Sequence, residues 1–546
     1  MIPGRLALRL LVLFTLALAA CTRPAGPGAD VRRVTLVGVS DWHGQLEPIT
    51  VIVDGPPRPA GGAAALKGYF DRERARNPEG TLVVMAGDSF GATPPVSAFL
   101  EDVPAVEAQN ALGVGADTLG NHNFDHGLTR LRNLLGLARF PYLSANVVAP
   151  DGSTLVPPGQ IVVLNGVRVG LVGVTNPDVP TLIGPGRAGD YRFLDPAPAA
   201  NAQAARLRHQ GAHVVVVLAH VGATAVAPDG TPLGRLGELA RALRGVEVLV
   251  GDHTDVTVNA QVGDVLVVQS RSKGVQYHVI DVDVDVGRRA VTRKSAAHRR
   301  PWADAITPDA ALHAQLEGYR AQVQPLFDHK VGETAVVVRR AGPLESPLGS
   351  AVADALRAAY GTQLAFVNSG GVRDDLPSSY RPADFALRRP IAGYRSGPPW
   401  DVVAGDVHAV LPFGNVAVTF QLTGRTLWQA LEHSVAAGTM VGGGFAGEDG
   451  RFLQVSGFRF RFDPRQPSGR RVVEVMLTDG TPIAANDREY TAATVDFVYA
   501  GGDGYRMLDN RTGVTRMPVT DTMREAIAQT SPVGPPAGGR IAIVRD

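Results

Sequence analysis

Five short polar segments constrain the fold of this chain most strongly, because four of them follow apolar runs of strand length. The runs, residues 34–39, 81–86, 214–219 and 246–250, are rich in β-branched residues, as buried strands are. The segments are Asp41-Trp-His43, Gly87-Asp88, Gly120-Asn-His-Asn-Phe-Asp125, His220 and Gly251-Asp-His-Thr-Asp255. Since open α/β sheets bind ligands beyond the carboxyl ends of their strands, we expect these segments to meet at one edge of a sheet.

The residue types in these segments are those that bind divalent metal ions. Carboxylates and amides offer oxygen ligands, imidazoles offer nitrogen, and Asp88 can bridge two ions through its two oxygens. Each segment alone has an ordinary explanation, such as a turn or helix cap at Asp88 or a buried neutral histidine at His220. Together, in this order and after these strands, they predict a two-metal site with the ligands Asp41, His43, Asp88, Asn121, His220, His253 and Asp255.

Residues 1–21 have the pattern of a bacterial lipoprotein signal peptide. Arg5 and Arg9 precede the apolar run 10–20, which is too short to span a bilayer. The run ends in Leu-Ala-Ala-Cys21, which resembles a lipobox, where the cysteine becomes lipidated; the alternative is a plain secretory signal with an incidental cysteine. Residues 22–30, rich in Pro and Gly, then form a flexible tether. We therefore expect an exported protein, anchored to the membrane by lipid and facing the periplasm or the cell exterior.

At 546 residues the chain is too long for one hydrophobic core, which predicts two domains. Strand-like runs alternate with helical stretches, which indicates a layered α/β domain over residues 31–305. A linker helix over residues 306–329, with Thr307 as its cap and Pro308 at its first position, leads to a second domain over residues 330–530. With 53 basic and 52 acidic residues, the composition does not predict a nucleic-acid polymer as a partner.

The metal segments resemble those of the calcineurin-like metallophosphoesterases, and within them the bacterial 5′-nucleotidase and UDP-sugar hydrolase family. The second domain extends the resemblance with Asn368-Ser-Gly-Gly-Val-Arg373, Leu411-Pro-Phe413-Gly-Asn415 and Phe497-Val-Tyr-Ala-Gly-Gly-Asp503. The resemblance covers nearly the whole mature chain. It implies a β-sandwich metallophosphoesterase domain flanked by helices, joined by the linker helix to an α/β nucleotide-recognition domain. We expect a monomer.

The resemblance also implies a role for each site residue. One divalent ion would be held by Asp41, His43, Asp88 and Asp255, and the other by Asp88, Asn121, His220 and His253. His122, oriented by Asp125, would stabilise charge on the phosphoryl group and protonate the leaving group. Arg373 would bind phosphate, Phe413 and Phe497 would sandwich the base, and Asn415 and Asp503 would contact the base or ribose.

The predicted activity is release of phosphate from nucleoside 5′-monophosphates by in-line attack of a metal-bound water, a reaction of nucleotide catabolism. Close alternatives are a 2′,3′-cyclic nucleotide phosphodiesterase/3′-nucleotidase and a UDP-sugar hydrolase. A sulfate thiohydrolase and a surface-displayed protein that binds without turnover are more distant. The aromatic pair Phe413 and Phe497 argues against the thiohydrolase, which needs no base sandwich.

Two departures from the family pattern lead to further expectations. The family usually has His or Gln where this chain has Asp255, and three carboxylates against two dications leave a net charge of about +1. This predicts a preference for manganese or magnesium over zinc. Second, Glu345-Ser-Pro-Leu-Gly349 is followed by Ser350 where the family often has a basic or amide residue. With Arg373 alone at the phosphate, nucleoside di- and triphosphates should bind less well than monophosphates.

Overall fold

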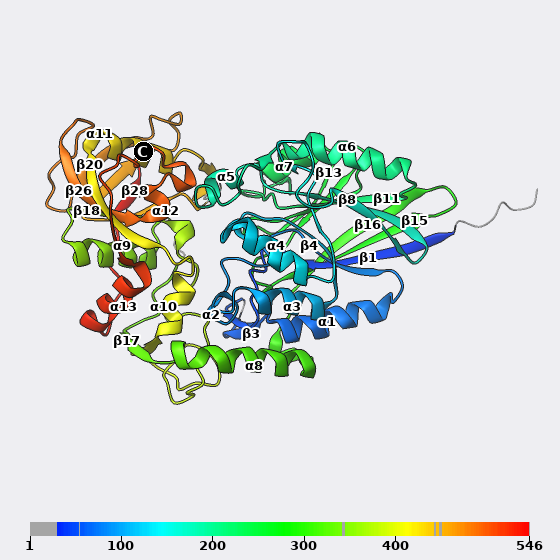
Figure 1. The fold of residues 1–546 in the computed structure, drawn as a ribbon, viewed down its shortest axis with the longest axis horizontal. Coiled ribbons are helices and arrows are strands. Elements are labelled where there is room, and N and C mark those ends of the chain that lie inside the picture. Colours follow the sequence, from blue (N-terminus) through cyan, green and yellow to red (C-terminus); the bar gives the residue numbers. More distant parts are fainter. Residues whose placement is uncertain (1–29, 54, 341–343, 442–443, 447–449, 545–546) are drawn as a thin grey trace, which may run out of the picture.

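Two six-stranded sheets form the N-terminal half of the protein (Figure 1). The computed structural model describes residues 30–53, 55–340, 344–441, 444–446 and 450–544. The first sheet has the order β16 (Ala290–Arg299), β15 (Tyr277–Asp285), β1 (Val31–Val39), β4 (Thr81–Met85), β5 (Val114–Thr118) and β6 (Tyr142–Leu143). The second has the order β13 (Val258–Val262), β14 (Val265–Gln269), β12 (Val248–Gly251), β11 (Val214–Ala219), β9 (Val167–Val174) and β8 (Gly159–Leu164).

The two sheets pack face to face around an aliphatic core. Leu36 and Val84 of the first sheet and Val216 and Val250 of the second belong to this one buried cluster. The outer face of the first sheet is covered by α1 (Ala63–Arg76), α3 (Val103–Leu112) and α4 (Gly127–Leu137). The outer face of the second is covered by α6 (Pro196–His209) and α7 (Arg235–Ala242). The predicted layered sandwich flanked by helices is confirmed.

Parallel strands lie at the centre of both sheets. In the first sheet β1, β4, β5 and β6 are parallel, and in the second β9, β11, β12 and β14 are parallel. Antiparallel strands flank them, β15 and β16 on one side of the first sheet and β8 and β13 on the two sides of the second, while β6 forms the other edge of the first sheet. The loops that leave the carboxyl ends of β1, β4, β11 and β12 carry the polar segments predicted to bind metal.

Helix α8 (Ala310–Phe327) links the two halves of the molecule, as predicted. It contacts α1, α3 and the short helix α2 (Pro95–Ala98) on one side and α10 (Ala404–Val410) on the other. The residue that caps it is Asp309, whose carboxylate accepts a hydrogen bond of 2.8 Å from the Leu312 amide. The expected cap at Thr307 is therefore wrong, because the helix begins after Asp309.

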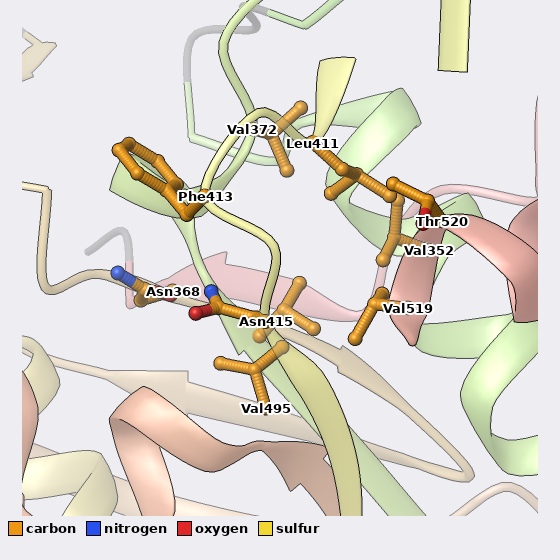
Figure 2. Close-up of a pocket in the computed structure, with 11 residues that line it drawn as sticks. Val352, Asn368, Val372, Leu411, Phe413, Asn415, Val495, Val519 and Thr520 are labelled. Carbon is orange, nitrogen blue, oxygen red and sulfur yellow. The ribbon is translucent and has the colours of Figure 1, made fainter. Parts of the chain in front are cut away.

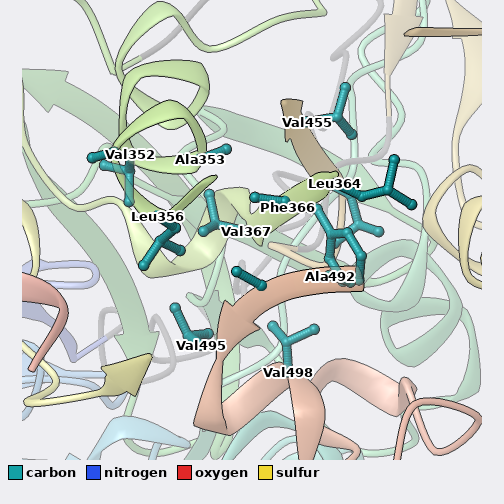
Figure 3. Close-up of a cluster of buried hydrophobic side chains, with 14 of the residues drawn as sticks. Val352, Ala353, Leu356, Leu364, Phe366, Val367, Val455, Ala492, Val495 and Val498 are labelled. Atoms are coloured by element: carbon teal, nitrogen blue, oxygen red, sulfur yellow. The ribbon is translucent and has the colours of Figure 1, made fainter. Parts of the chain in front are cut away.

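The C-terminal half is built around a five-stranded sheet with helices packed against it. Its order is β23 (Leu453–Ser456), β18 (Leu364–Asn368), β26 (Glu489–Val495), β20 (Val416–Thr423) and β27 (Val514–Pro518). Figure 3 shows Val352 and Leu356 of α9 (Pro347–Tyr360) in the cluster that also contains Phe366 of β18 and Val495 of β26. Further helices are α11 (Gly424–Ser434), α12 (Asp496–Tyr499) and α13 (Val519–Thr530).

Smaller sheets and short elements complete the fold. A three-stranded sheet contains β25 (Val472–Leu477), β24 (Phe458–Phe462) and β28 (Ile541–Ile543). Two-stranded pairs are β2 (Ile49–Val51) with β3 (Arg58–Ala60), β7 (Val147–Val148) with β10 (Arg192–Phe193), β17 (Lys330–Thr334) with β19 (Trp400–Val403), and β21 (Thr439–Val441) with β22 (Gly444–Ala446). The remaining helical turns are η1 (His122–Phe124), α5 (Val179–Leu182), η2 (Ala303–Ala305), η3 (Ser369–Gly371) and η4 (Gly502–Gly504).

The predicted signal peptide with Cys21, and the tether up to residue 29, lie outside the described residues. Within the described part of the chain, none of the helices combines the length and the apolar composition needed to cross a bilayer.

Candidate metal centre and nucleotide cleft

Four predicted ligands come together where the central strands of the sandwich end. Asp41 follows β1, Asp88 follows β4, His220 follows β11 and His253 follows β12. Asn121 joins them from the loop after β5. Of these five side chains, all but that of His253 are almost completely buried. Loops from both sheets therefore converge on one small volume.

The donor atoms of these residues form two overlapping groups. His220 Nε2 lies 3.1 Å from Asp88 Oδ2, 3.0 Å from Asn121 Oδ1 and 3.1 Å from His253 Nδ1. In the second group, one ligand atom each from Asp41, His43 and Asp88 lie within 4.8 Å of one another. Asp88 belongs to both groups, which is the position that a carboxylate bridging two ions requires.

The loops that hold these ligands have unusual backbone conformations. Asp41, His43, Asp88 and His253 all have positive φ, at 42°, 49°, 45° and 80°. Such conformations are costly for residues with a side chain and cluster at functional sites. The glycine before Asn121 is required for a different reason, since a Cβ at Gly120 would lie 2.1 Å from Asp88 Oδ1.

Backbone carbonyls orient two of the imidazoles toward the cluster. His43 Nδ1 lies 3.0 Å from the Gly91 carbonyl oxygen, and His220 Nδ1 lies 3.2 Å from that of Ala86. A proton on each Nδ1 would be donated to these carbonyls, which leaves Nε2 with its lone pair facing the other donors. Histidines that bind metal are commonly fixed by such a second hydrogen bond.

Burial and mutual charge shift the pKa values of the clustered groups. Burial raises the pKa of Asp41 to about 6. Burial and the neighbouring His220 lower the pKa of His253 to about 3, so this imidazole is neutral and able to donate a lone pair. Oxygen and neutral nitrogen donors in this number suit divalent metal ions, and the residues present fit the expected cofactors.

The structure does not bring Asp255 into either group. Its carboxylate accepts hydrogen bonds of 2.6 Å from Arg271 Nη2 and 2.9 Å from the Ser272 amide, and its side chain is 48% exposed. Asp252, which the sequence analysis did not assign, lies in the cluster instead: it forms a third group with Asp41 and His220. Burial and Asp41 raise the pKa of Asp252 well above its ordinary value. In the sequence, the only sign that Asp252 lies in the cluster is its position directly before His253.

His122 and Asp125 form the predicted pair beside the cluster of metal-binding side chains. His122 Nδ1 lies 2.8 Å from Asp125 Oδ2, and the His122 amide donates a hydrogen bond of 2.9 Å to Asp88 Oδ1. Burial by itself lowers the pKa of His122, but the carboxylates of Asp125 and Asp88 outweigh it and raise this pKa. The imidazole therefore lies next to Asp88, with its Nδ1 held by Asp125.

A buried carboxylate that the sequence analysis missed supports the loop of Asp88. Asp117, in β5, accepts hydrogen bonds of 2.9 Å from the Gly87 amide and 2.5 Å from Ser89 Oγ, which flank Asp88. Its sequence neighbours Ala116 and Thr118 carry no signal of this role. Burial raises the pKa of Asp117 to about 6.

The C-terminal half supplies the other wall of a cleft of about 1170 Å³. Arg373, Phe413, Asn415, Phe497 and Asp503 all line this cleft together with Asp41, His43, Asp88, His122 and His253. The predicted substrate residues and most of the predicted ligands thus face one another across the two halves.

Contacts within the cleft join the two halves directly. Arg373 Nη2 lies 3.2 Å from His43 Nε2, and the Phe413 ring stacks on that of His122 with centroids 5.5 Å apart. Figure 2 shows Phe413 extending away from a small apolar pocket to which Asn368 and Asn415 also contribute. Asn368 Nδ2 donates a hydrogen bond of 2.7 Å to Asp503 Oδ2.

Arg373 is not the only cation in the cleft. Lys273 and Arg340 line it as well, and Lys273 Nζ donates a hydrogen bond of 2.8 Å to the Arg373 carbonyl oxygen. Burial and the charge of Arg340 lower the pKa of Arg373 to about 10. The premise of a lone arginine, from which weaker binding of di- and triphosphates was expected, is wrong.

A buried donor cluster on a sandwich of this kind, facing an aromatic and cationic cleft, defines the class of metal-dependent phosphoester hydrolases. Residues 330–510 match the family model described as the 5′-nucleotidase C-terminal domain. The structure of a 5′-nucleotidase precursor from Thermus thermophilus superposes with a TM-score of 0.79 at 28% identity, covering 94% of this chain and 100% of that one.

Two further similarities complete the comparison. The chain is 27% identical to the cell wall protein Lmo0130 of Listeria monocytogenes, over 93% of this chain and 69% of that protein. The sulfate thiohydrolase SoxB of Thermus thermophilus shares the fold, with a TM-score of 0.76 at 20% identity over 94% of this chain and 97% of that one. Residues 330–510 thus match a 5′-nucleotidase C-terminal domain, and the similarity of nearly the whole chain to a 5′-nucleotidase precursor agrees with the resemblance drawn from the motifs.

Proposed function

We propose that the protein is an exported, metal-dependent 5′-nucleotidase that releases phosphate from nucleoside 5′-monophosphates. The observation that carries the proposal is the meeting of Arg373 Nη2 with His43 Nε2 at 3.2 Å, because it brings a phosphate-binding side chain against the metal-binding cluster. A phosphate held by Arg373 would therefore lie beside Asp41, His43 and Asp88.

Each wall of the cleft would perform part of the reaction. Two divalent ions held by the cluster would supply Lewis acidity and a nucleophile at neutral pH. Arg373 would bind and orient the phosphate, and His122, aligned by Asp125, would stabilise charge on the phosphoryl group and give a proton to the leaving oxygen. Phe413 and Phe497 would hold the base, with Asn415 and Asp503 as polar contacts to base or ribose.

Export is supported by the N-terminal sequence pattern and by the cell wall protein among the relatives. In this proposal residues 1–21 are the signal peptide, Cys21 carries the lipid and residues 22–30 are the tether. One lipid chain binds a membrane only weakly, so stable anchoring would use more than one acyl chain.

Three alternative enzyme activities would cleave bonds other than the 5′-phosphate ester. A 2′,3′-cyclic nucleotide phosphodiesterase/3′-nucleotidase or a UDP-sugar hydrolase would use the same donors, and a sulfate thiohydrolase shares the fold. The aromatic side chains of Phe413 and Phe497 in the cleft favour a substrate with a base over the carrier-protein cysteine on which a sulfate thiohydrolase acts.

The test is phosphate release from a panel of nucleotides by metal-loaded and by chelator-treated protein. We expect metal-dependent release from AMP, none after chelation, and recovery when manganese is restored. Cleavage of 3′-AMP, 2′,3′-cyclic AMP or UDP-glucose in preference to AMP would support the corresponding alternative. Nucleotide binding without release in any metal would support the non-catalytic protein.

A further inference from the structure

We infer that Asp252, and not Asp255, supplies the third carboxylate of the metal-binding cluster, next to Asp41 and His220. This inference rests on the proposed function, since it assigns a residue to the same metal centre. The assignment follows from the different surroundings of the two aspartates.

Asp252 has one carboxylate oxygen that its surroundings do not satisfy. The side chain is fully buried directly after β12, at the carboxyl end where the ligands gather. Its Oδ1 accepts a hydrogen bond of 2.9 Å from the His253 amide. Its Oδ2 is buried and has no hydrogen-bond partner among the described residues. Leaving a carboxylate oxygen unpaired in the interior is costly, and a bound cation removes that cost.

The unsatisfied carboxylate lies among other metal-binding groups. One ligand atom each from Asp41, His220 and Asp252 lie within 4.8 Å of one another, and all three side chains are buried. His220 in turn contacts Asp88 and Asn121, which ties Asp252 to the predicted bridging carboxylate. A carboxylate that enters this group would act on the same ions as the predicted ligands.

Asp255 has the opposite environment. Arg271 and Ser272 already bind both of its carboxylate oxygens, and half of the side chain faces solvent. To bind an ion, Asp255 would have to give up a salt bridge and two hydrogen bonds. Asp252 could bind an ion through Oδ2 and keep the hydrogen bond that its Oδ1 accepts from the His253 amide.

The sequence analysis derived the net charge of the metal site from Asp255. The same net charge follows when Asp252 takes the place of Asp255. With two dications bound, Asp41, Asp88 and Asp252 would all be ionised, and their three negative charges would leave a net charge of about +1. A third hard oxygen ligand favours manganese or magnesium over zinc, whose preference for nitrogen and sulfur is stronger. Metal preference therefore depends on Asp252.

The experiment measures manganese and zinc binding to dialysed full-length protein by isothermal titration calorimetry, in the wild type, Asp252→Asn and Asp255→Asn. We expect Asp252→Asn to weaken manganese binding about tenfold or more and zinc binding less, while Asp255→Asn changes both by less than about threefold. The ratio of the two affinities is decisive, because an aspartate that only supports Asp41 would alter both metals equally.

Thermal unfolding of the chelated proteins checks folding, and Asp252→Ser serves as a second variant if Asp252→Asn does not fold. Weakened binding in Asp255→Asn, unchanged binding in Asp252→Asn, or equal weakening of both metals would each overturn the inference. If the wild type binds metal and Asp252→Asn behaves as expected, but no nucleotide is hydrolysed, the proposed function fails and the inference stands. If AMP is hydrolysed in a metal-dependent reaction but Asp252→Asn binds metal as the wild type does, the inference fails and the proposed function stands.

Discussion

At the scale of single residues, the role proposed for His122 rests on three contacts. Its ring nitrogen is held by Asp125 at 2.8 Å, its amide binds Asp88, and Phe413 of the other half covers its ring. These contacts fix the imidazole between the metal cluster and the nucleotide cleft. A side chain so placed can act on the phosphoryl group without binding metal.

Replacing His122 by Gln should lower kcat for AMP by about a hundredfold or more, since general acid catalysis contributes on this order. Manganese affinity should stay the same, because no ligand is removed. Asp125→Asn is the matched variant and should lower kcat less, as it only releases the ring. Steady-state kinetics and calorimetry check both; a loss of metal binding in His122→Gln would contradict the role given to it.

His278 is a second residue whose surroundings decide its behaviour. It is fully buried opposite Gly38 in the pairing of β15 with β1, and neither ring nitrogen has a hydrogen-bond partner in the described part of the chain. Burial lowers its pKa to about 3 from an ordinary value of 6.5. The unfolded chain therefore binds a proton more readily than the folded protein between these two pH values, and the free energy of unfolding falls as pH decreases.

His278→Leu should remove this acid sensitivity. Between pH 7 and pH 5 the wild type should lose about 2 kcal/mol more of its unfolding free energy than the variant, a difference of about 1.4 kcal/mol per pH unit below 6.5. Thermal melting at both pH values provides the measurement. His313→Leu, which removes an exposed histidine of α8, is the control. Equal acid sensitivity of the wild type and His278→Leu would show that His278 carries no such penalty.

At the scale of elements, the carboxyl-terminal loops of the strands position the chemistry. The sequence predicts the strands and helices closely, because long valine-rich runs and helical periodicity are local signals; β11 spans residues 214–219, as expected. The structure also brings Asp88, His220 and His253, three of the predicted ligands, together after these strands.

The exceptions depend on contacts between distant loops. Asp255 leaves the cluster because Arg271 and Ser272, in the loop after β14, capture its carboxylate. Asp252 enters because the loop after β12 turns its buried side chain toward Asp41. No spacing rule distinguishes two aspartates three residues apart when a partner sixteen positions away decides between them.

Asp117 shows how one strand end supports another. Its carboxylate binds the Gly87 amide and Ser89 Oγ on either side of Asp88, and also Gln109 Nε2 at 3.0 Å. In Asp117→Asn the side-chain amide group, which is itself a donor, would face some of these donors and could not accept their hydrogen bonds. The loop that carries Asp88 should therefore be held less firmly. We expect manganese affinity to fall about 10- to 100-fold, as it does when groups that support ligands are changed.

Calorimetric titration with manganese measures this loss, and Asp283→Asn is the control for the Asp117 variant. Asp283 is an aspartate of the same sheet whose carboxylate binds Arg33 near the surface, away from the cleft. Affinity equal to that of the wild type in Asp117→Asn would mean that the Asp88 loop keeps its conformation without this support.

At the scale of the whole molecule, the two halves meet on several sides of the cleft. Helix α8 packs against α1 of the N-terminal half and α10 of the C-terminal half (Figure 1). The short helix α5 contacts η4. Between these contacts, Lys273 reaches from the loop after β14 to the Arg373 carbonyl, while its own amide donates to the Asp41 carbonyl at 2.8 Å. Lys273 thus joins the backbone of Asp41, a predicted metal ligand, to that of Arg373, the residue proposed to bind phosphate.

Because Lys273 is hydrogen-bonded to both halves, a change in the distance between the halves would also move Arg373 relative to Asp41. A hydrogen bond from a charged donor is worth about 1.5–3 kcal/mol, which corresponds to about a tenfold change or more in affinity. Lys273→Met keeps the length of the side chain and removes the donor. We expect KM for AMP to rise by about that factor, metal affinity to stay the same, and the radius of gyration of the nucleotide-free protein to increase as the halves separate.

Kinetics and small-angle X-ray scattering on the full chain test this expectation, with Lys67→Met as the control because Lys67 binds Asp71 within α1. An unchanged radius of gyration combined with a raised KM would mean that Lys273 acts on the substrate directly rather than by holding the halves together. If neither quantity changes, the contacts through α8 and α5 are sufficient to set the closed arrangement, and Lys273 serves only to satisfy the Arg373 carbonyl.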